Sequence, residues 1–362
     1  IFISGTKNML RVLNVTYIIS LIGIFLGIIA FAMTSNSEFV TLFNQFIAGT
    51  DSQLRSSADP YHAAIAAAAQ NGYTPPPFVF AAPLIPMMAG AVLWTFYATY
   101  FAGEIKGADS IKRNLASMLG SAVFNLVTLA LLLYVYFGAV GYEFLSAISF
   151  LAYIPGMLPA GWDPVWVSTF FFGLVAKNPI LASIIILGVA LGHTIIYAPV
   201  LIMQVQRNIF AWSLDRLMPD KLSEVSPKYH SPLYAVIAGT VVVEIALVAL
   251  IVSYSIDPMS IWSVYSLLII GPAFACMFLP GVSAIVLPWK KRDMYEASPA
   301  KIEVAGIPVL SIAGIVEIAF ILWMLYEYIV WPGFGISNPV FIALTFGIFV
   351  FGIIHCVSEL FG

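Results

Sequence analysis

Three ionisable residues, His193, Glu244 and Glu317, lie deep inside long apolar runs, where side chains could bind a ligand or a proton. Two more, Glu104 and Glu359, lie near the ends of such runs. A charge at the centre of a bilayer costs about 2.5–3.5 kcal/mol on insertion scales, so each inner residue is a functional candidate. The alternative is a neutral, hydrogen-bonded packing residue. The sequence favours that alternative for Glu244 and Glu317. It leaves both open for His193, whose imidazole can titrate near physiological pH.

A second cluster of chemically useful residues is the stretch 94–100, which reads Trp94-Thr95-Phe96-Tyr97-Ala98-Thr99-Tyr100. Aromatic and β-branched residues are weak helix formers, and Gly90 and Gly103 flank the stretch. The pattern predicts a broken helix, which is tolerated at membrane depth only where protein or a water-filled cavity surrounds it. Plain aromatic packing is the alternative. Gly271-Pro272 and Pro280-Gly281 suggest a second break.

Other kinds of chemistry find no support in the sequence. It contains no paired His and carboxylate spacing for a metal and no nucleophile elbow, so we expect no enzyme, no metal and no cofactor. Cys276 and Cys356 both fall inside apolar runs and are expected to be small buried apolar side chains. A net charge of −3 and a pI near 5.8 give no electrostatic footprint for nucleic acid.

The elements that carry these residues are predicted to be membrane-spanning helices. Apolar residues make up 61% of the 362-residue chain and charged residues 9%, with a mean hydropathy of +0.98. A surface with so few charges cannot face mainly water. The apolar runs are continuous rather than alternating, and a helix needs about 20 apolar residues to span a bilayer. We predict one all-α transmembrane domain, 1–362, with eight spans, near 11–33, 79–105, 115–140, 180–205, 233–255, 261–287, 304–330 and 338–360.

The placement of lysine and arginine predicts the orientation. Of the 15 such residues, all but Arg55 and Lys177 fall on one side of the predicted membrane, and cytoplasmic loops carry the excess of positive charge. The C-terminus is therefore expected in the cytoplasm. The two long connections, 34–78 and 141–179, are expected outside. We predict one or two short surface helices in the first loop and two short apolar segments in the second, lying as a cap.

Two segments resemble the amino acid–polyamine–organocation (APC) superfamily of permeases. The first, 206–219 followed by Ser231-Pro232, is similar to the cytoplasmic end of the family's eighth helix and the start of its ninth. Arg207, Asp215, Pro219 and Pro232 match, whereas Arg216 replaces the usual glycine. The second segment, 94–114, with Glu104 and the basic pair Lys112-Arg113, looks like the family's sixth helix and the loop after it.

The resemblance covers essentially the whole chain and implies a broken-helix, inverted-repeat transporter fold of twelve helices. The eight predicted spans would then be helices five to twelve, with the N-terminal four helices absent from this chain. Either the protein is longer or a second chain supplies the remainder; the first is the stronger expectation.

The resemblance also implies a function, a secondary active transporter that moves amino acids across the plasma membrane. Trp94 would act as an aromatic lid, and His193 and Tyr197 would face the substrate from the fourth span. The backbone around the break would contact the substrate, at Phe96, Tyr97, Ala98, Thr99 and Tyr100. Coupling to protons, to another ion or by exchange stays open, with His193 as the coupling candidate.

Two readings compete with the transporter. One is a channel-like subunit or non-transporting scaffold of a larger complex, and the other is a membrane-embedded enzyme. The expected partners are an amino acid and the lipid bilayer. The sequence decides neither the oligomeric state nor which amino acid is carried.

Overall fold

The computed structural model describes residues 6–74, 110–162, 167–229, 231–256, 277–298 and 301–330. The predicted spans 79–105 and 338–360, and the first part of 261–287, lie outside these residues. Contacts divide the chain into two compact units. One consists of residues 1–77 and 124–245, and the other of residues 78–123 and 246–362.

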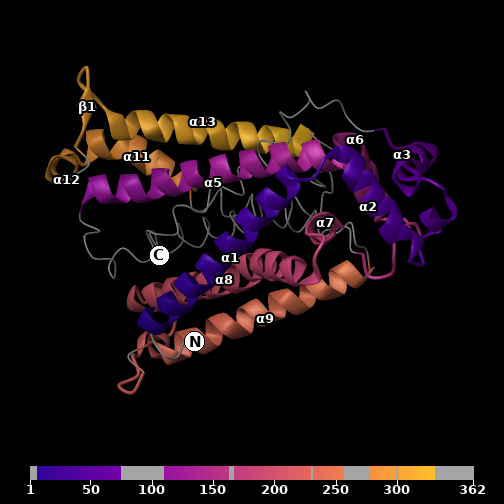
Figure 1. Ribbon diagram of the computed structural model, residues 1–362. Helices are drawn as coiled ribbons and strands as arrows, with labels where there is room; N and C mark the ends of the chain where they lie inside the picture. Colours follow the sequence, from indigo (N-terminus) through magenta and orange to yellow (C-terminus); the bar gives the residue numbers. More distant parts are fainter. Residues whose placement is uncertain are drawn as a thin grey trace. The chain divides into compact units, whose positions relative to one another are not determined.

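Helices dominate the first unit (Figure 1). It contains α1 (Thr6–Ala32), α2 (Asn36–Ala48), η2 (Gln53–Ser56), α3 (Pro60–Gln70), α6 (Tyr142–Leu151), α7 (Val167–Val175), α8 (Pro179–Leu214) and η4 (Asp220–Ser223). Two further helices, α5 (Ile111–Val140) and α9 (Leu233–Ile256), run from one unit into the other.

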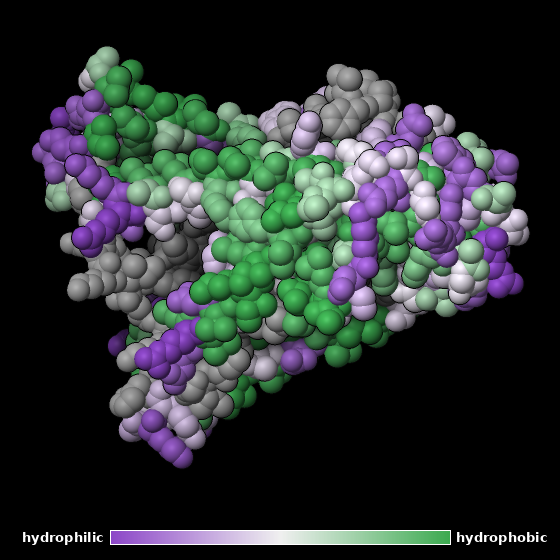
Figure 2. Space-filling model, in the orientation of Figure 1, coloured by the Kyte–Doolittle hydropathy of each residue, from purple (hydrophilic) through white to green (hydrophobic). Residues whose placement is uncertain are grey.

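Three helices of the described part are long and apolar enough to cross a bilayer. They cover Leu10–Ala32, Ile111–Val140 and Val309–Glu327. Helices α8 and α9 contain shorter apolar stretches, Pro179–Ala190 and Leu233–Ala249. In the space-filling view, apolar side chains cover much of the visible surface (Figure 2). The eight spans and their orientation remain predictions.

Short helices occupy the two segments predicted as outer loops, and these helices share a buried aromatic core. Phe43 of α2 packs edge-on against Phe144 of α6, with ring centroids 4.8 Å apart, and both side chains are fully buried. Tyr61 of α3 stacks on Phe144 at 4.1 Å. Phe171 of α7 lies 5.9 Å from the same ring. The loops therefore form a packed cap rather than loose surface segments.

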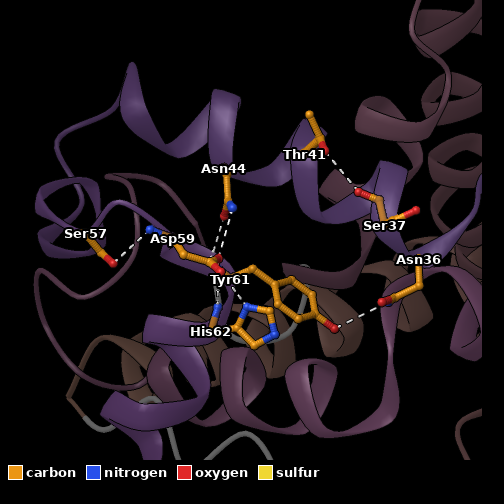
Figure 3. A network of polar contacts seen from close by, with 8 residues as sticks. All are labelled: Asn36, Ser37, Thr41, Asn44, Ser57, Asp59, Tyr61 and His62. Atoms are coloured by element: carbon orange, nitrogen blue, oxygen red, sulfur yellow. Dashed lines mark hydrogen bonds and ion pairs between the residues drawn. The ribbon is translucent and has the colours of Figure 1, made fainter.

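Hydrogen bonds attach this cap to the end of helix α5. Tyr61 Oη donates to the Val140 carbonyl at 2.9 Å, and Asn36 Nδ2 donates to the Ala139 carbonyl at 3.0 Å. The two side chains also meet, with Asn36 Nδ2 at 3.5 Å from Tyr61 Oη (Figure 3). The last carbonyls of a helix lack intrahelical donors, so these side chains satisfy them. The next residue, Gly141, has φ +85, and a Cβ there would lie 2.5 Å from Tyr61 Oη. Only glycine allows this turn to sit so close to the tyrosine.

The second unit contains α11 (Leu279–Lys290), α12 (Arg292–Ala297), the strands β1 (Glu303–Val304) and β2 (Ile307–Pro308), and α13 (Val309–Val330). The strands pair antiparallel around Ala305 and Gly306, which both have positive φ. Because this hairpin occupies residues 303–308, helix α13 begins at Val309, later than the predicted span start at 304. The hairpin is the one exception to the all-α prediction within the residues that the structure describes.

Candidate functional site

The predicted site residues divide into two groups. Six of them, Trp94, Phe96, Tyr97, Ala98, Thr99 and Tyr100, lie outside the described residues, as does Glu104 of the family motif. His193 and Tyr197 belong to helix α8, whose backbone is described. Helix α8 and the contacts that hold it therefore form the described part of the candidate site.

Side-chain caps fix the start of helix α8. Asn178 accepts hydrogen bonds from the backbone N–H groups of Ile180 and Leu181 at 2.9 and 3.2 Å. Pro179 occupies the first turn, where its fixed φ suits a helix and its missing N–H removes no helical bond. Lys177, which precedes the cap residue Asn178, has φ +55 and pairs with Glu38 of α2 at 2.5 Å. The helix is thus anchored to the cap at its predicted outer end.

A glycine contact holds the middle of helix α8 against helix α1. A Cβ added at Gly188 would lie 2.6 Å from the Cα of Gly23, and one added at Gly23 would lie 2.7 Å from the Cα of Gly188. Ser20 Oγ, which is buried, donates to the Gly188 carbonyl at 2.6 Å. Small residues let membrane helices approach closely, and polar side chains then bond across the contact. The two backbones therefore touch at this point.

This contact indicates which side of helix α8 could serve a ligand. At about 100° per residue, positions 193 and 197 lie about 140° and about 180° around the helix from Gly188. Both register positions are therefore turned away from the Gly188 contact with α1.

Gln206 of helix α8 is a buried polar residue whose amide nitrogen has no partner among the described residues. Gln206 is 7% exposed, and its Nε2 forms no hydrogen bond in the described part of the chain. Helix α9 approaches it at Gly239, where an added Cβ would lie 3.4 Å from Gln206 Cγ. Buried amides normally have a hydrogen-bond partner, and ordered water often supplies it. Sequence reasoning missed this residue because glutamine carries no charge.

The family-like turn after helix α8 keeps its geometry despite Arg216. Arg216 N–H donates to the Ser213 carbonyl at 3.1 Å, and Leu217 N–H donates to the Trp212 carbonyl at 2.8 Å. These two bonds are those of a Schellman motif, which needs a left-handed residue after the cap residue Asp215. Arg216 adopts φ +61 to supply it. The replacement of the family's glycine by arginine therefore leaves the turn intact.

The remaining motif residues continue this arrangement toward helix α9. Ser213 Oγ donates to the Pro219 carbonyl at 2.7 Å, which ties the turn back to the helix. The carbonyl of Pro232 accepts from Val236 N–H at 3.0 Å and so begins helix α9. Lys221 Nζ lies 4.8 Å from the centroid of the Tyr234 ring. The motif therefore builds a compact connection between two helices.

The contact between α1 and α8 had a signal in the sequence, since Gly23 and Gly27 are spaced by four residues as in membrane-helix contacts. The residue of α8 that Gly23 meets, Gly188, could not be predicted from this spacing.

In the described residues, no group of three or more His, Cys, Asp or Glu side chains is arranged to hold a metal ion.

Long apolar helices, close glycine contacts and capped helix ends define an α-helical integral membrane protein. The family model described as amino acid permease matches residues 1–354, and the chain belongs to this family. It is therefore a multi-pass membrane permease, a transporter rather than an enzyme by family. Comparisons with curated proteins and with solved structures find no match.

Proposed function

We propose that this permease is a secondary active transporter that moves amino acids by alternating access, driven by a proton, by another ion or by exchange. The observation that carries the proposal is the family match over residues 1–354. The long apolar helices agree with it. Each half of the cycle would expose a site near the bilayer midplane to one side of the membrane.

The proposed substrate site combines a broken helix at 94–100 with helix α8. Trp94 would cover the site from outside, and backbone groups from Phe96 to Tyr100 would contact the substrate. Free N–H groups at the start of a half-helix favour a carboxylate, which every amino acid carries. His193 and Tyr197 would complete the site from α8, and the rigid attachment of α8 to α1 supports a fixed wall there.

The wider architecture is part of the same proposal. We expect eight spans within this chain, corresponding to helices five to twelve of a twelve-helix inverted-repeat fold, and a C-terminus in the cytoplasm. Cysteine-accessibility labelling of intact cells tests the orientation. A cysteine introduced in the cap, for example Ser56→Cys in the exposed part of η2, should react with an impermeant reagent from outside.

Ligand-induced stabilisation tests the function itself. The purified protein would be heated with each of the twenty amino acids and with common polyamines. A ligand at 100 times its dissociation constant stabilises the folded state by about 2.7 kcal/mol. A shift confined to one chemical class identifies the substrate. An absence of any shift, together with no uptake into proteoliposomes, would contradict the proposal and favour a scaffold.

Variants on helix α8 test the site. His193→Ala should alter the pH dependence of uptake, because imidazole titrates near physiological pH, and Tyr197→Phe should weaken substrate binding. Tyr234→Phe, on the surface of α9 beside Lys221, is the matched control and should bind substrate normally. Unchanged binding and pH dependence in both α8 variants would remove these residues from the site.

A further inference from the structure

Glu317 is a glutamate at the middle of helix α13. The helix covers Val309–Val330, so Glu317 lies near the centre of its apolar stretch. Its side chain is half-buried, and it forms no hydrogen bond or ion pair among the described residues. The sequence favours a hydrogen-bonded packing role for this glutamate. Within the described part of the chain, the partner that such a role requires is not found.

The carboxyl group of Glu317 faces helix α11. Helices α11 and α13 run side by side in the second unit (Figure 1). Their backbones meet at Gly281 and Gly314, where a Cβ added at Gly314 would lie 2.6 Å from the Gly281 carbonyl oxygen. A Cβ added at Gly281 would lie 3.4 Å from Glu317 Oε2. The absence of a side chain at Gly281 thus provides the space in which the carboxyl group sits.

The two sides of helix α13 explain why this position is unusual. Ser311 and Gly314 are buried and contact α11, and Glu317 follows Gly314 by three residues on the same side of α13. Ile315 and Val316, on the other side, are 57% and 63% exposed, as expected for lipid-facing residues. A carboxyl group directed to lipid is costly to ionise, whereas one between two helices has protein beside it, and the packing of the two helices can change its environment.

Two other polar side chains of the same helix pair, Ser311 and Glu327, form hydrogen bonds. Ser311 Oγ donates to the Ile285 carbonyl at 3.1 Å and accepts from Trp289 Nε1 at 3.2 Å. Farther along α13, Glu327 accepts from Trp323 Nε1 at 3.1 Å. The carboxyl group of Glu317 differs from these two side chains, because it has no partner among the described residues.

The charged surroundings indicate which ligand is suitable. Among described residues, the only titratable group of helix α11 is Lys290, at its last position, about 13 Å along the axis from Gly281. The nearest titratable groups of α13 itself are Tyr326 and Glu327, at least nine residues after Glu317. Strand β2, which also contacts α13, carries none. In this part of the chain, no cation is therefore at hand to balance a carboxylate.

We propose that Glu317 is a proton-binding site of this permease. The carboxylate takes up one proton to give a neutral carboxylic acid, and it releases that proton when transport changes the contact between α11 and α13. This deepens the proposed function and rests on it, because the proton would couple to solute movement. An ionised carboxylate at the centre of a span is costly, so the group's charge would respond to helix packing. Helix α11 begins beside Glu317 with Pro280 and a wider, π-type turn at Met277 and Phe278, and such turns often mark functional positions.

Proteoliposomes test the proposal, with an equimolar mixture of the twenty radiolabelled amino acids as the probe. A pH gradient of about 1 unit with one coupled proton supports up to about tenfold accumulation. Wild type should accumulate solute under this gradient. Glu317→Gln should keep solute exchange without a gradient but lose the gradient-driven accumulation. Glu327→Gln is the matched control on the same helix and should behave as wild type.

Each outcome has a distinct meaning. Wild type without exchange or accumulation contradicts the proposed function itself. Exchange without any effect of the pH gradient leaves transport standing but overturns the proton site. Gradient-driven accumulation that survives in Glu317→Gln also overturns it. So does a loss that appears only in His193→Ala or in Glu244→Gln, whose carboxyl group is exposed on α9.

A measurement on the unmodified protein covers the case in which Glu317→Gln does not fold. Hydrophobic carbodiimides react with protonated carboxyl groups, so mass spectrometry should find Glu317 modified at low pH and progressively less as the pH rises. Glu327, which accepts a bond from Trp323, serves as the internal comparison. Modification of Glu317 that is absent, or equal at every pH, overturns the proposal.

Discussion

Replacing Gly188 by alanine tests whether helices α1 and α8 touch as described. The added methyl group would lie 2.6 Å from the Cα of Gly23, which is 0.8 Å short of an ordinary contact at 3.4 Å. The methyl carbon is bonded directly to the backbone of α8, and the atom that it meets belongs to the backbone of α1. No side chain can rotate away, so the helices must separate. Separation would also lengthen the hydrogen bond from Ser20 Oγ to the Gly188 carbonyl, now 2.6 Å.

The expected magnitude follows from these two effects. Overpacking a tight contact costs about 1–3 kcal/mol, and a bond between membrane helices contributes about 0.6 kcal/mol on average. Gly138→Ala is the matched control, because nothing lies within 4 Å of a Cβ at Gly138 in helix α5. Alanine's better helix propensity then applies to both variants. Gly188→Ala should be about 2–4 kcal/mol less stable than Gly138→Ala.

Equilibrium unfolding of the purified protein in mixed detergent, followed by far-UV circular dichroism, measures this difference. Gly23→Ala should have a similar effect, since it meets Gly188 at 2.7 Å. The double variant Gly23→Ala/Gly188→Ala should lose less stability than the two single variants lose together, because helices already separated by one methyl group accommodate the second. Equal stability of Gly188→Ala and Gly138→Ala would refute the close approach, and strict additivity would show that the two glycines do not meet.

Three further predictions concern the cap and the turn after α8. Tyr61→Phe should lower stability by about 1–3 kcal/mol, because the buried Val140 carbonyl loses its donor; thermal unfolding measures this. Burial alone would raise the pKa of Asp59, but hydrogen bonds from Asn44 and His62 outweigh it and hold the pKa below the ordinary 3.8. Asp59 therefore stabilises the cap above its unfolded-state pKa, and this contribution disappears as the pH falls through the lowered folded-state value. Unfolding midpoints measured from about pH 6 to about pH 3 should fall less in Asp59→Asn than in wild type. Arg216→Gly should raise stability by about 0.5–1 kcal/mol in the same unfolding assay, because glycine adopts the left-handed backbone conformation of residue 216 without steric strain. A loss of stability would show that Arg216 is not strained.

The class of the protein was readable from the sequence. Continuous apolar runs predict membrane helices, because a bilayer offers no partner for backbone polar groups and a helix satisfies its own. The short helices of the cap were also predictable from the polar breaks around 34–78 and 141–179. The motifs at 206–219 and 94–114 together indicate a permease, and the family match agrees.

Contacts between distant residues were decided only by the tertiary structure. The spacing of Gly23 and Gly27 signals a helix contact, but nothing in the sequence says that the partner is Gly188, 165 residues beyond Gly23. The turn at Arg216 depends on two backbone hydrogen bonds rather than on the residue type, so the missing glycine was a misleading signal. Glu317 illustrates the same limit, since the sequence favours a hydrogen-bonded packing role for it, whereas no partner is found among the described residues. Whether a buried polar group finds a partner depends on packing between helices, and local sequence does not encode that packing.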